Sequence, residues 1–205
     1  MSAQMNRPLA SPGQRIGLFG GSFNPAHEAH RAASLYAWKR LGLDRVWWLV
    51  SPGNPLKETK SLPPIDARLA GARRVAESPF IEVTDIEARL GTRFTYDTVS
   101  RLKACHPKVR FVLLMGADIL PKFHRWKRWR ELASSIPLAV IDRSGWTARA
   151  LASPAAQALA RTRVPEYGAL TLAARKPPAW VFLSGLKLAQ SSSALRMKPG
   201  GVRKG

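Results

Sequence analysis

Residues 15–31 read Arg-Ile-Gly-Leu-Phe-Gly-Gly-Ser-Phe-Asn-Pro-Ala-His-Glu-Ala-His-Arg, and this stretch determines the architecture of the chain. Residues 16–19 form a short apolar run closed by glycines, as expected of a strand buried on both faces of a parallel sheet. Gly20 and Gly21 then predict a turn, because glycine permits conformations and close approaches that a side chain would block. From Ala26 to Leu41 the composition is helical. The stretch therefore predicts a strand, a turn and a helix in succession.

His27 and His30 lie three residues apart at the start of this predicted helix. Residues at that spacing share a helix face. Backbone N–H groups at a helix N-terminus are unpaired and the macrodipole is positive there, so the position favours an anion. Two imidazoles at this edge can donate hydrogen bonds to the phosphoryl oxygens of a transition state. The alternative is a pair of surface histidines on an ordinary helix, and the glycines with the Asn24-Pro25 stop favour the phosphate site.

Apolar runs and helical patterns alternate along the chain, which predicts an α/β fold, a Rossmann-like open parallel sheet with helices on both faces. The expected strands are Arg15–Phe19, Arg45–Val50, Ile81–Thr84, Val109–Met115, Leu138–Asp142 and Trp180–Leu183. The expected helices are Ala29–Leu41, Asp66–Ala76, Asp97–Cys105, Arg128–Ser134 and Ala148–Ala160. The segments Ser51–Pro64 and Arg163–Pro178 are rich in Pro and basic residues and are expected to be linkers, the first lying over the site as a mobile loop. Site residues should follow strands, since ligands of such sheets bind beyond the carboxyl ends of the strands.

A chain of 205 residues can bury one core, so we expect a single domain over residues 15–198. Residues 1–14 are expected to form a flexible tail and residues 199–205 a basic one. No apolar run approaches the roughly 20 residues of a membrane span, and the first residues do not resemble a secretory signal. The single cysteine, Cys105, excludes an internal disulfide and a multi-cysteine metal site. These features predict a cytoplasmic protein.

The net charge is unusually high, because 33 Lys and Arg oppose 13 Asp and Glu to give a formal +20. A field of that sign raises the local concentration of anionic ligands. Nucleotide substrates need only a handful of cations, so the surplus indicates either non-specific nucleic-acid binding or an Arg-rich composition of the lineage. We favour the second, since the basic residues are spread along the chain and are dense only at Lys122–Arg130 and Arg196–Lys204.

Two further segments follow predicted strands. Residues 190–196, Gln-Ser-Ser-Ser-Ala-Leu-Arg, place hydroxyl groups and an Arg at the start of a short helical stretch. Taken alone, the serines would be interpreted as an ordinary N-cap. Residues 116–118, Gly-Ala-Asp, follow the strand at 109–115, and Asp118 taken alone would cap the next helix. The fingerprints G-x-G-x-x-G and G-x-x-x-x-G-K-[ST] are absent, which argues against a dehydrogenase and a P-loop kinase.

Taken together, these motifs resemble those of a known superfamily. Residues 20–30, Gly-Gly-Ser-Phe-Asn-Pro-Ala-His-Glu-Ala-His, resemble the HxGH signature of the nucleotidylyltransferases. Within that superfamily, the sequence Gly-Gly-Ser-Phe-Asn-Pro is most similar to that of bacterial nicotinate-nucleotide adenylyltransferases. Ala29 departs from the pattern, because the family has glycine between the histidines. Residues 191–196 resemble the second signature, Ile-Ser-Ser-Thr-x-Ile-Arg, and residues 116–118 its Gly-x-Asp. The resemblance runs in the right order from Arg15 to Arg196, and two motifs about 160 residues apart agree on one phosphate site.

The resemblance implies a catalytic group of His27, His30, Lys57 and Arg196, which would place two anions in line and stabilise charge on the transferring group. The ATP-binding residues that it implies are Gly20, Gly21, Ser22, Phe23, Gly116, Asp118, Ser191, Ser192 and Ser193. Within that set the serines, with Arg196, would bind phosphates, and Gly116 and Asp118 would lie along the adenosine ribose. No protein metal ligand is implied, and Mg²⁺ is expected to be carried with ATP.

For the second substrate the resemblance implies Asn54, Thr95 and Trp126. Residues 94–98, Phe-Thr-Tyr-Asp-Thr, resemble the family's Tyr-Thr-x-Asp-Thr segment, in which the threonine, here Thr95, faces a pyridine carboxylate. Trp126 is placed to stack on the pyridine ring, with core packing as the alternative, whereas Trp129 is expected in the core. Residues 54–57, Asn-Pro-Leu-Lys, resemble the family's Asn-Pro-His-Lys loop with Leu56 in place of the histidine.

The implied reaction is adenylyl transfer from ATP to nicotinate mononucleotide, which gives pyrophosphate and deamido-NAD (nicotinate adenine dinucleotide) in NAD biosynthesis. Two alternatives stay open. Phosphopantetheine adenylyltransferase shares the histidine motif, although Trp126 and the Arg196 ending argue against it, and a non-catalytic basic nucleic-acid-binding protein would account for the charge. ATP and nicotinate mononucleotide are the expected partners, with no membrane and no sequence-specific nucleic acid. The oligomeric state is left open, a homo-oligomer included.

Overall fold

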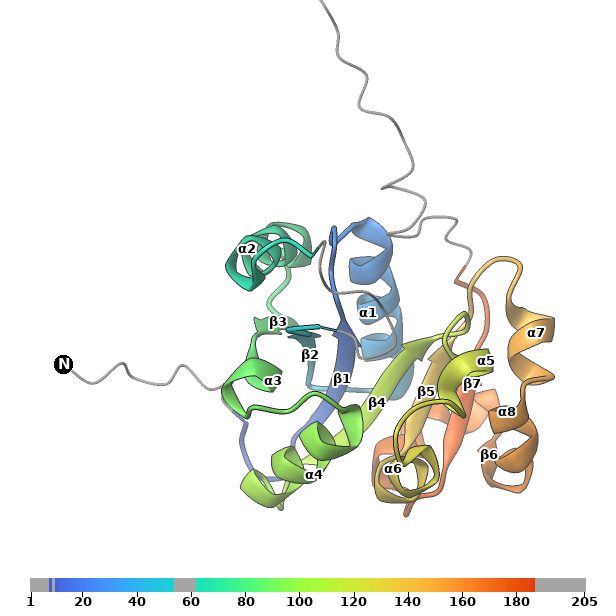
Figure 1. Ribbon diagram of the computed structural model, residues 1–205. Coiled ribbons are helices and arrows are strands. Elements are labelled where there is room, and N and C mark those ends of the chain that lie inside the picture. The colour runs from blue at the N-terminus through green and yellow to red at the C-terminus, as the bar shows by residue number, and fades with distance from the viewer. Residues whose placement is uncertain (1–7, 9, 54–61, 187–205) are drawn as a thin grey trace, which may run out of the picture.

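A seven-stranded sheet forms the centre of the computed structural model, which describes residues 8, 10–53 and 62–186 (Figure 1). The strand order is β3-β2-β1-β4-β5-β7-β6, and every neighbouring pair is parallel. The strands are β1 (Arg15–Gly21), β2 (Arg45–Val50), β3 (Ile81–Thr84), β4 (Arg110–Gly116), β5 (Leu138–Ile141), β6 (Arg163–Val164) and β7 (Trp180–Leu183). The predicted open parallel sheet is confirmed.

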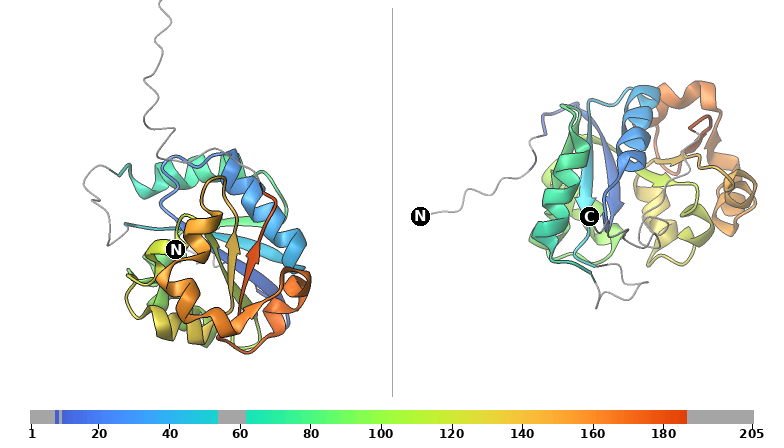
Figure 2. Two further views of the ribbon diagram at one scale, coloured as in Figure 1. Left: turned by 90° about the vertical axis from the view of Figure 1, so that its right-hand side faces the viewer. Right: turned by 90° about the horizontal axis from the view of Figure 1, so that it is seen from above.

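Helices cover both faces of this sheet (Figure 2). The helices are α1 (Glu28–Leu41), α2 (Ile65–Ala76), α3 (Ile86–Arg89), α4 (Thr95–Cys105), α5 (Leu120–Phe123), α6 (Trp129–Ser135), α7 (Thr147–Leu151) and α8 (Pro154–Ala158), with two 3-10 segments, η1 (Ala160–Thr162) and η2 (Glu166–Ala174). One core lies between the sheet and α3 to α8, and the second lies under α1, α2 and η2. No helix within the described residues is long and apolar enough to span a membrane.

Alternate residues of each central strand contribute to the two cores, as the pleat of a strand requires. Ile16 and Leu18 of β1 are fully buried on the α4 side, and Gly17 faces the α1 side. A Cβ at Gly17 would lie 2.8 Å from terminal side-chain carbons of both Leu114 and Leu43, so a larger residue here would require both leucine side chains to shift. The α1 layer therefore packs closely on β1.

The strand order reverses at the centre of the sheet. From β1 the chain moves outward to β2 and β3, and then returns to β4 on the other side of β1. In open α/β sheets a ligand binds beyond the carboxyl ends of the strands at such a point. The loops that follow β1 and β4 are therefore the expected walls of a site.

Three local predictions were wrong. Gly20 and Gly21 are the last residues of β1, paired with β2, and the turn follows at residues 24–25. The predicted linker Arg163–Pro178 contains the edge strand β6 and η2, whose Ala169, Leu172 and Ala173 are buried against the sheet. The predicted helix Ala148–Ala160 is divided into α7, α8 and η1, because Pro154 begins a new helix and Ser153 caps it.

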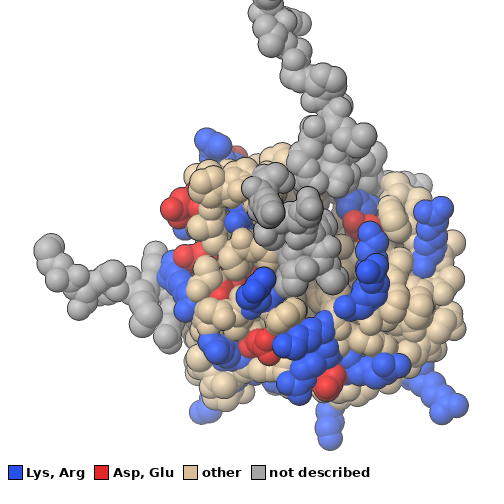
Figure 3. All heavy atoms as spheres, in the orientation of Figure 1, with Lys and Arg blue, Asp and Glu red and all other residues tan. Residues whose placement is uncertain are grey.

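The positive charge is not confined to one element of the surface. On the face drawn in Figure 3, Lys and Arg side chains outnumber acidic ones and spread from one side of the molecule to the other. This distribution agrees with the sequence, in which basic residues occur throughout. On this face, therefore, the positive charge is spread over several elements.

Candidate active site

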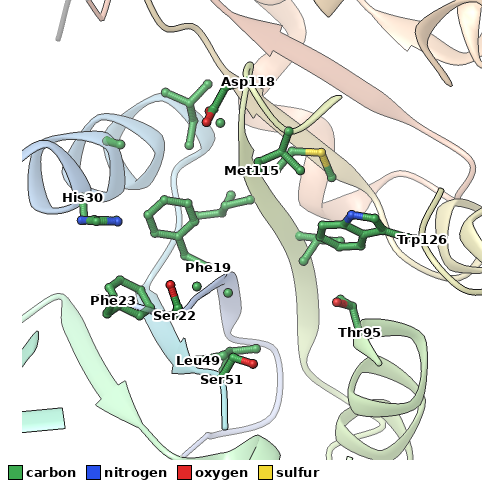
Figure 4. Close-up of a pocket in the computed structure, with 18 of the residues that line it drawn as sticks. Phe19, Ser22, Phe23, His30, Leu49, Ser51, Thr95, Met115, Asp118 and Trp126 are labelled. Atoms are coloured by element: carbon green, nitrogen blue, oxygen red, sulfur yellow. The ribbon is translucent and has the colours of Figure 1, made fainter. Parts of the chain in front are cut away.

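A cavity of about 520 Å³ opens where the strand order reverses. Its walls come from the ends of β1, β2, β4 and β5, from the start of α1 and from the segment before α4. Figure 4 shows His30 on one side of this pocket, with Trp126 and Thr95 on the opposite side. Residues far apart in the sequence thus meet in one place, as expected for site residues that follow parallel strands.

At two positions in the pocket wall the residue is a glycine, which leaves space that a side chain would fill. A Cβ at Gly20 would meet no atom within 4 Å, so this backbone faces open space in the pocket. At Gly116 a Cβ would lie 2.5 Å from Oδ1 of Asp118, so glycine lets that carboxylate fold back over the end of β4. The glycines act here through the absence of a side chain rather than through a turn.

The two histidines occupy the N-terminus of α1 and both line the pocket. His27 is the N-cap residue, and His30 lies three positions further, with 3.9 Å between the ring centroids. The backbone N–H of His27 donates to Nδ1 of His30 over 3.2 Å. Because Nδ1 accepts this bond, the proton of the neutral His30 ring lies on Nε2. His30 can therefore act as a hydrogen-bond donor without carrying a charge.

Aromatic rings fix the position of His30. Phe23 stacks on Trp48 with 4.8 Å between ring centroids, and the His30 ring lies 5.0 Å from Phe23 and 6.0 Å from Trp48. Trp48 donates Nε1–H to the Ser34 hydroxyl over 2.7 Å, and that hydroxyl donates to the carbonyl of His30 over 2.8 Å. Phe23 has a φ of 44°, a strained conformation of the kind that clusters at functional sites.

Both imidazoles are held in the neutral form. Burial, followed by the charges of His27 and Arg143, lowers the pKa of His30 to about 3. Burial and Arg143 also lower the pKa of His27, which is only 7% exposed. Neither ring nitrogen of His27 has a hydrogen-bond partner within the described residues. A buried polar atom without a partner is costly, so an anion that accepts from His27 would remove this cost.

A cation and a carboxylate form the part of the pocket wall at the ends of β4 and β5. Asp118 pairs with Arg143 over 3.0 Å, and both side chains are about a quarter exposed. Asp142 accepts from the backbone N–H of Arg143 and from the hydroxyl of Thr147, each over 2.7 Å, which holds the loop after β5. Asp118 thus orients Arg143 at the pocket and does not cap the next helix, whose N-cap is Ile119.

At the opposite end, Thr95 begins α4 and Trp126 follows α5. Trp126 is partly buried and packs edge-on against Phe123 with 5.4 Å between centroids, which leaves it in the pocket wall. Trp129 is 9% exposed and belongs to the core, as predicted. A flat ring could therefore lie on Trp126 while a polar substituent meets the N-terminal turn of α4.

Sequence reasoning missed several charged groups that the fold brings to this region, Arg93 and Lys127 of the pocket wall among them. Arg143 and Glu87 line the pocket, and Arg68, 5% exposed, lies behind its wall. Arg68 donates to the backbone carbonyls of Ser22 and Ser51 over 2.9 and 2.6 Å and to that of Pro63 over 3.0 Å, so it ties the ends of β1 and β2 together. The position of Arg143 directly after β5 was the available signal.

Of the predicted site residues, those in the described part of the chain all line the same pocket: Gly20, Gly21, Ser22, Phe23, His27, His30, Thr95, Gly116, Asp118 and Trp126. The remaining predicted residues lie outside the described residues: Asn54, Lys57, Ser191, Ser192, Ser193 and Arg196.

Comparison with known proteins supports one family. Residues 18–197 match the family model described as cytidylyltransferase-like. The chain is 55% identical over 186 residues to the probable nicotinate-nucleotide adenylyltransferase of Bradyrhizobium sp. (strain BTAi1), covering 91% of this chain and 97% of that protein. It is 50% identical over 195 residues to the protein of the same name from Roseobacter denitrificans, covering 95% and 98%.

Among solved structures, the fold is similar to that of Plasmodium falciparum nicotinic acid mononucleotide adenylyltransferase complexed with NaAD. The TM-score is 0.67 at 20% identity, with 89% of this chain and 82% of that chain covered. This likeness concerns the fold, whereas the sequence identities concern the family. The chain therefore belongs to the cytidylyltransferase-like superfamily and, within it, to the nicotinate-nucleotide adenylyltransferases.

Proposed function

We propose that the pocket binds ATP and nicotinate mononucleotide side by side and joins them into nicotinate adenine dinucleotide, the reaction of its family in NAD biosynthesis. The observation that carries the assignment of the reacting centre is the pair of buried, neutral imidazoles at the N-terminus of α1, which line the pocket where His30 packs beside β1 and β2. Helix N-termini with unpaired N–H groups bind phosphate.

In the reaction an oxygen of the 5′-phosphate of nicotinate mononucleotide forms a bond to the α-phosphorus of ATP. The bond from that phosphorus to the α–β bridging oxygen breaks, and pyrophosphate leaves with the electron pair. The substrate phosphate is already a nucleophile, so no side chain has to serve as one. Catalysis then depends on positioning and on stabilising the charge of the transferring group.

His30 has the clearest role in this scheme. Its Nε2–H donor is fixed by the bond that Nδ1 accepts from the His27 backbone, and its position is fixed by Phe23 and Trp48. A donor held in place before the reaction is worth more than one that has to reorient. His27 would supply a second donor, since its ring nitrogens have no partner within the described residues.

Arg143 would neutralise phosphate charge at the β4 and β5 edge, oriented by Asp118. Gly20 and Gly116 would let the nucleotide approach the backbone, with Gly21, Ser22 and Phe23 along the same wall. Lys57, Arg196 and the serines at 191–193 stay predicted phosphate partners, and Asn54 a predicted contact of the mononucleotide, since they lie outside the described residues.

The pyridine ring of the mononucleotide would stack on Trp126. Its carboxylate would meet Thr95 and the backbone N–H groups at the N-terminus of α4, where the helix dipole favours a negative group. This end of the pocket lies across from His30 (Figure 4). The placement would let one substrate reach from Trp126 toward the histidines.

Magnesium would enter with the polyphosphate of ATP. Within the described residues no three His, Cys, Asp or Glu side chains gather into a metal-binding group, which suits an ion held chiefly by substrate and water. When bound, the ion would neutralise phosphate charge during the transfer. A cytoplasmic location and a single domain over residues 15–198 are further proposals.

The test is pyrophosphate release by the purified protein. ATP is supplied with nicotinate mononucleotide, with its amide analogue or with phosphopantetheine, and the product is identified by mass. Rapid release with nicotinate mononucleotide is expected, with a mass equal to nicotinate adenine dinucleotide. Release with phosphopantetheine alone would replace this assignment with the other member of the superfamily.

A further inference from the structure

A buried carboxyl group in the pocket wall has no role in the reaction described above. Glu87 of α3 lines the pocket and is 9% exposed. Its Oε1 accepts a hydrogen bond from the Thr98 hydroxyl over 3.4 Å, and Ser51, whose hydroxyl donates to the carbonyl of Gly53 over 3.0 Å, lies beside the carboxyl group. Thr98 is fully buried and hydrogen-bonded to Thr92 over 2.8 Å, so the partner of Glu87 is itself fixed. The carboxyl group is therefore held in one place by neighbouring elements.

Glu87 lies at the end of the pocket that would receive the pyridine. Thr98 follows Thr95 by three residues on α4, so the two share a helix face. Glu87, Phe94, Thr95 and Trp126 all line the same cavity, and Thr95 and Trp126 lie on the side of it that faces His30. A carboxylate of the substrate at Thr95 would thus share this end of the site with the carboxyl group of Glu87.

Two ionised carboxylates in a buried site repel each other, and one of them then takes up a proton. The charged side chains on the elements around Glu87 include Asp85, Arg89, Arg93, Asp97 and Arg101, with Arg68 behind Ser51 and with Arg125 and Lys127 in the wall of the same pocket. Asp85 and Arg89 are paired with each other over 2.7 Å, and Arg68 bonds to backbone carbonyls. Burial raises the pKa of Glu87 to about 7, against the lowering effect of Ser51 and Thr98. The group can thus change its protonation state near neutral pH.

We propose that Glu87 is a specificity-determining residue that carries a proton when nicotinate mononucleotide is bound, so that the pyridine carboxylate meets a neutral O–H donor instead of a second negative charge. This inference rests on the proposed function. The proton comes from solvent when an ionised Glu87 meets the acid substrate, and it returns on release. The amide analogue carries no charge on its ring substituent and does not require this proton.

The two mononucleotides carry the same 5′-phosphate and meet the same histidines, so other titrations cancel in the ratio of their kcat/KM values. We expect the acid-to-amide ratio of the wild-type protein to fall roughly tenfold between pH 7 and pH 8.5, as Glu87 loses its proton. In Glu87→Gln the side chain stays neutral and keeps an acceptor oxygen for Thr98. Its ratio should be independent of pH.

Glu82→Gln is the matched control. Burial also raises the pKa of Glu82, but this residue lies on β3 and does not line the pocket. The control should show the wild-type fall. Thr98→Val provides a second variant that leaves Glu87 in place. Loss of the Thr98 bond should move the midpoint of the fall to higher pH, because that bond favours the ionised carboxylate.

The possible results distinguish failure of the proposed function from failure of the inference about Glu87. Absence of adenylyl transfer to either mononucleotide in the wild-type protein would overturn the proposed function, and this inference with it. Transfer to the acid with a ratio that does not change with pH would overturn the inference alone, as would an equal loss with both mononucleotides in Glu87→Gln. That last pattern would make Glu87 an ionised acceptor for a group that both substrates share. If Glu87→Gln fails to fold, an unchanged midpoint in Thr98→Val overturns the inference and a raised midpoint supports it.

Discussion

The backbone N–H of His27 donates a hydrogen bond to Nδ1 of His30 over 3.2 Å. The N-cap of α1 thereby fixes both the orientation and the tautomer of the second histidine, whose Nε2–H is left for a ligand. If this helix N-terminus binds the phosphate, as proposed, the same helix also orients the donor. The histidine pair at spacing three, with a helix that begins between them, contributes to this arrangement together with the Phe23 and Trp48 rings.

Replacement of His30 by alanine should lower kcat by roughly two to three powers of ten, with a smaller effect on either KM. Loss of one preorganised donor costs about 2.7–4 kcal/mol of transition-state stabilisation. His27→Ala should have a similar effect. Steady-state kinetics of both purified variants, with circular dichroism to verify folding, provides the measurement. Near-normal turnover in both would contradict the assigned role of the pair.

The low pKa of His30 also predicts how stability changes with pH. The unfolded imidazole binds a proton near pH 6.5, whereas the folded group does so near pH 3. Between these values the unfolded chain carries more protons, so the free energy of unfolding falls as the pH falls. Between pH 7 and pH 5 this group should cost about 2 kcal/mol.

Urea unfolding of wild type and His30→Gln at pH 7 and pH 5 measures this contribution. The wild-type protein should lose about 2 kcal/mol more than the variant over that interval. The comparison concerns the change with pH in each protein, so a general loss of stability in the variant does not affect it. Equal losses in the two proteins would show that His30 is not buried as a neutral group.

Arg143 should affect ligand binding more than stability. Its pair with Asp118 is partly exposed, and such pairs contribute about 0–1 kcal/mol to folding. A charged hydrogen bond to phosphate contributes about 1.5–3 kcal/mol, so Arg143→Met should raise the KM for ATP at least about tenfold. The pKa of His27 should rise in the same variant, because the charge of Arg143 lowers it.

A matched control is available in Arg40→Met, which breaks the pair between Arg40 and Glu166 over 2.7 Å. Arg40 does not line the pocket, so its variant should leave the KM for ATP unchanged. Kinetics and histidine NMR titrations of the two variants distinguish the roles. Equal effects of the two substitutions on KM would indicate a general influence of charge rather than a phosphate contact at Arg143.

Most of the sheet could be predicted because its strands are buried on both faces. The predicted bounds of β2, β3 and β7 agree with the structure, since continuous apolar runs such as residues 46–50 have few other uses. The segment at 163–178 could not be predicted in this way. Its strand has only two residues and its nine-residue helix is of the 3-10 type, so neither gives the period of an ordinary strand or α-helix, although side chains such as Leu172 are buried.

Some residues of the candidate site could likewise be predicted from the sequence, and others could not. The rule that ligands bind beyond strand ends predicted that His27, after β1, and Asp118, after β4, would meet in one pocket, and the family resemblance added Trp126. Glu87 was missed because a single acidic residue on a four-residue helix has the sequence pattern of a surface group. Glu87 is buried only because the end of β2 and the second turn of α4 pack over it. This packing joins segments distant in the sequence, so no local sequence pattern predicts it.

Two glycines of β1 should respond oppositely to alanine. At Gly20 a Cβ enters open pocket space, so Gly20→Ala should fold normally and raise the KM for ATP. At Gly17 a Cβ would lie 2.8 Å from carbons of Leu114 and Leu43, and such overpacking costs roughly 1–3 kcal/mol. Gly17→Ala should therefore unfold more readily with unchanged KM. Thermal unfolding and kinetics of both variants test the pair, and a stability loss at Gly20 would place its Cβ against protein instead of ligand.

Trp126 and Trp129 lie three residues apart, on either side of the turn that begins α6, and should have different functions. Trp126 lines the pocket, whereas Trp129 is 9% exposed and packs in the core beside Phe123. Trp126→Ala should raise the KM for nicotinate mononucleotide and leave that for ATP nearly unchanged, and Trp126→Phe should recover part of the loss because it retains a stacking surface. Trp129→Ala should instead lower the free energy of unfolding by about 3–5 kcal/mol. Kinetics with each substrate varied separately, together with urea unfolding, decide between the two roles. A weakened KM for ATP with an unchanged KM for the mononucleotide in Trp126→Ala would place the adenine, rather than the pyridine, on this ring.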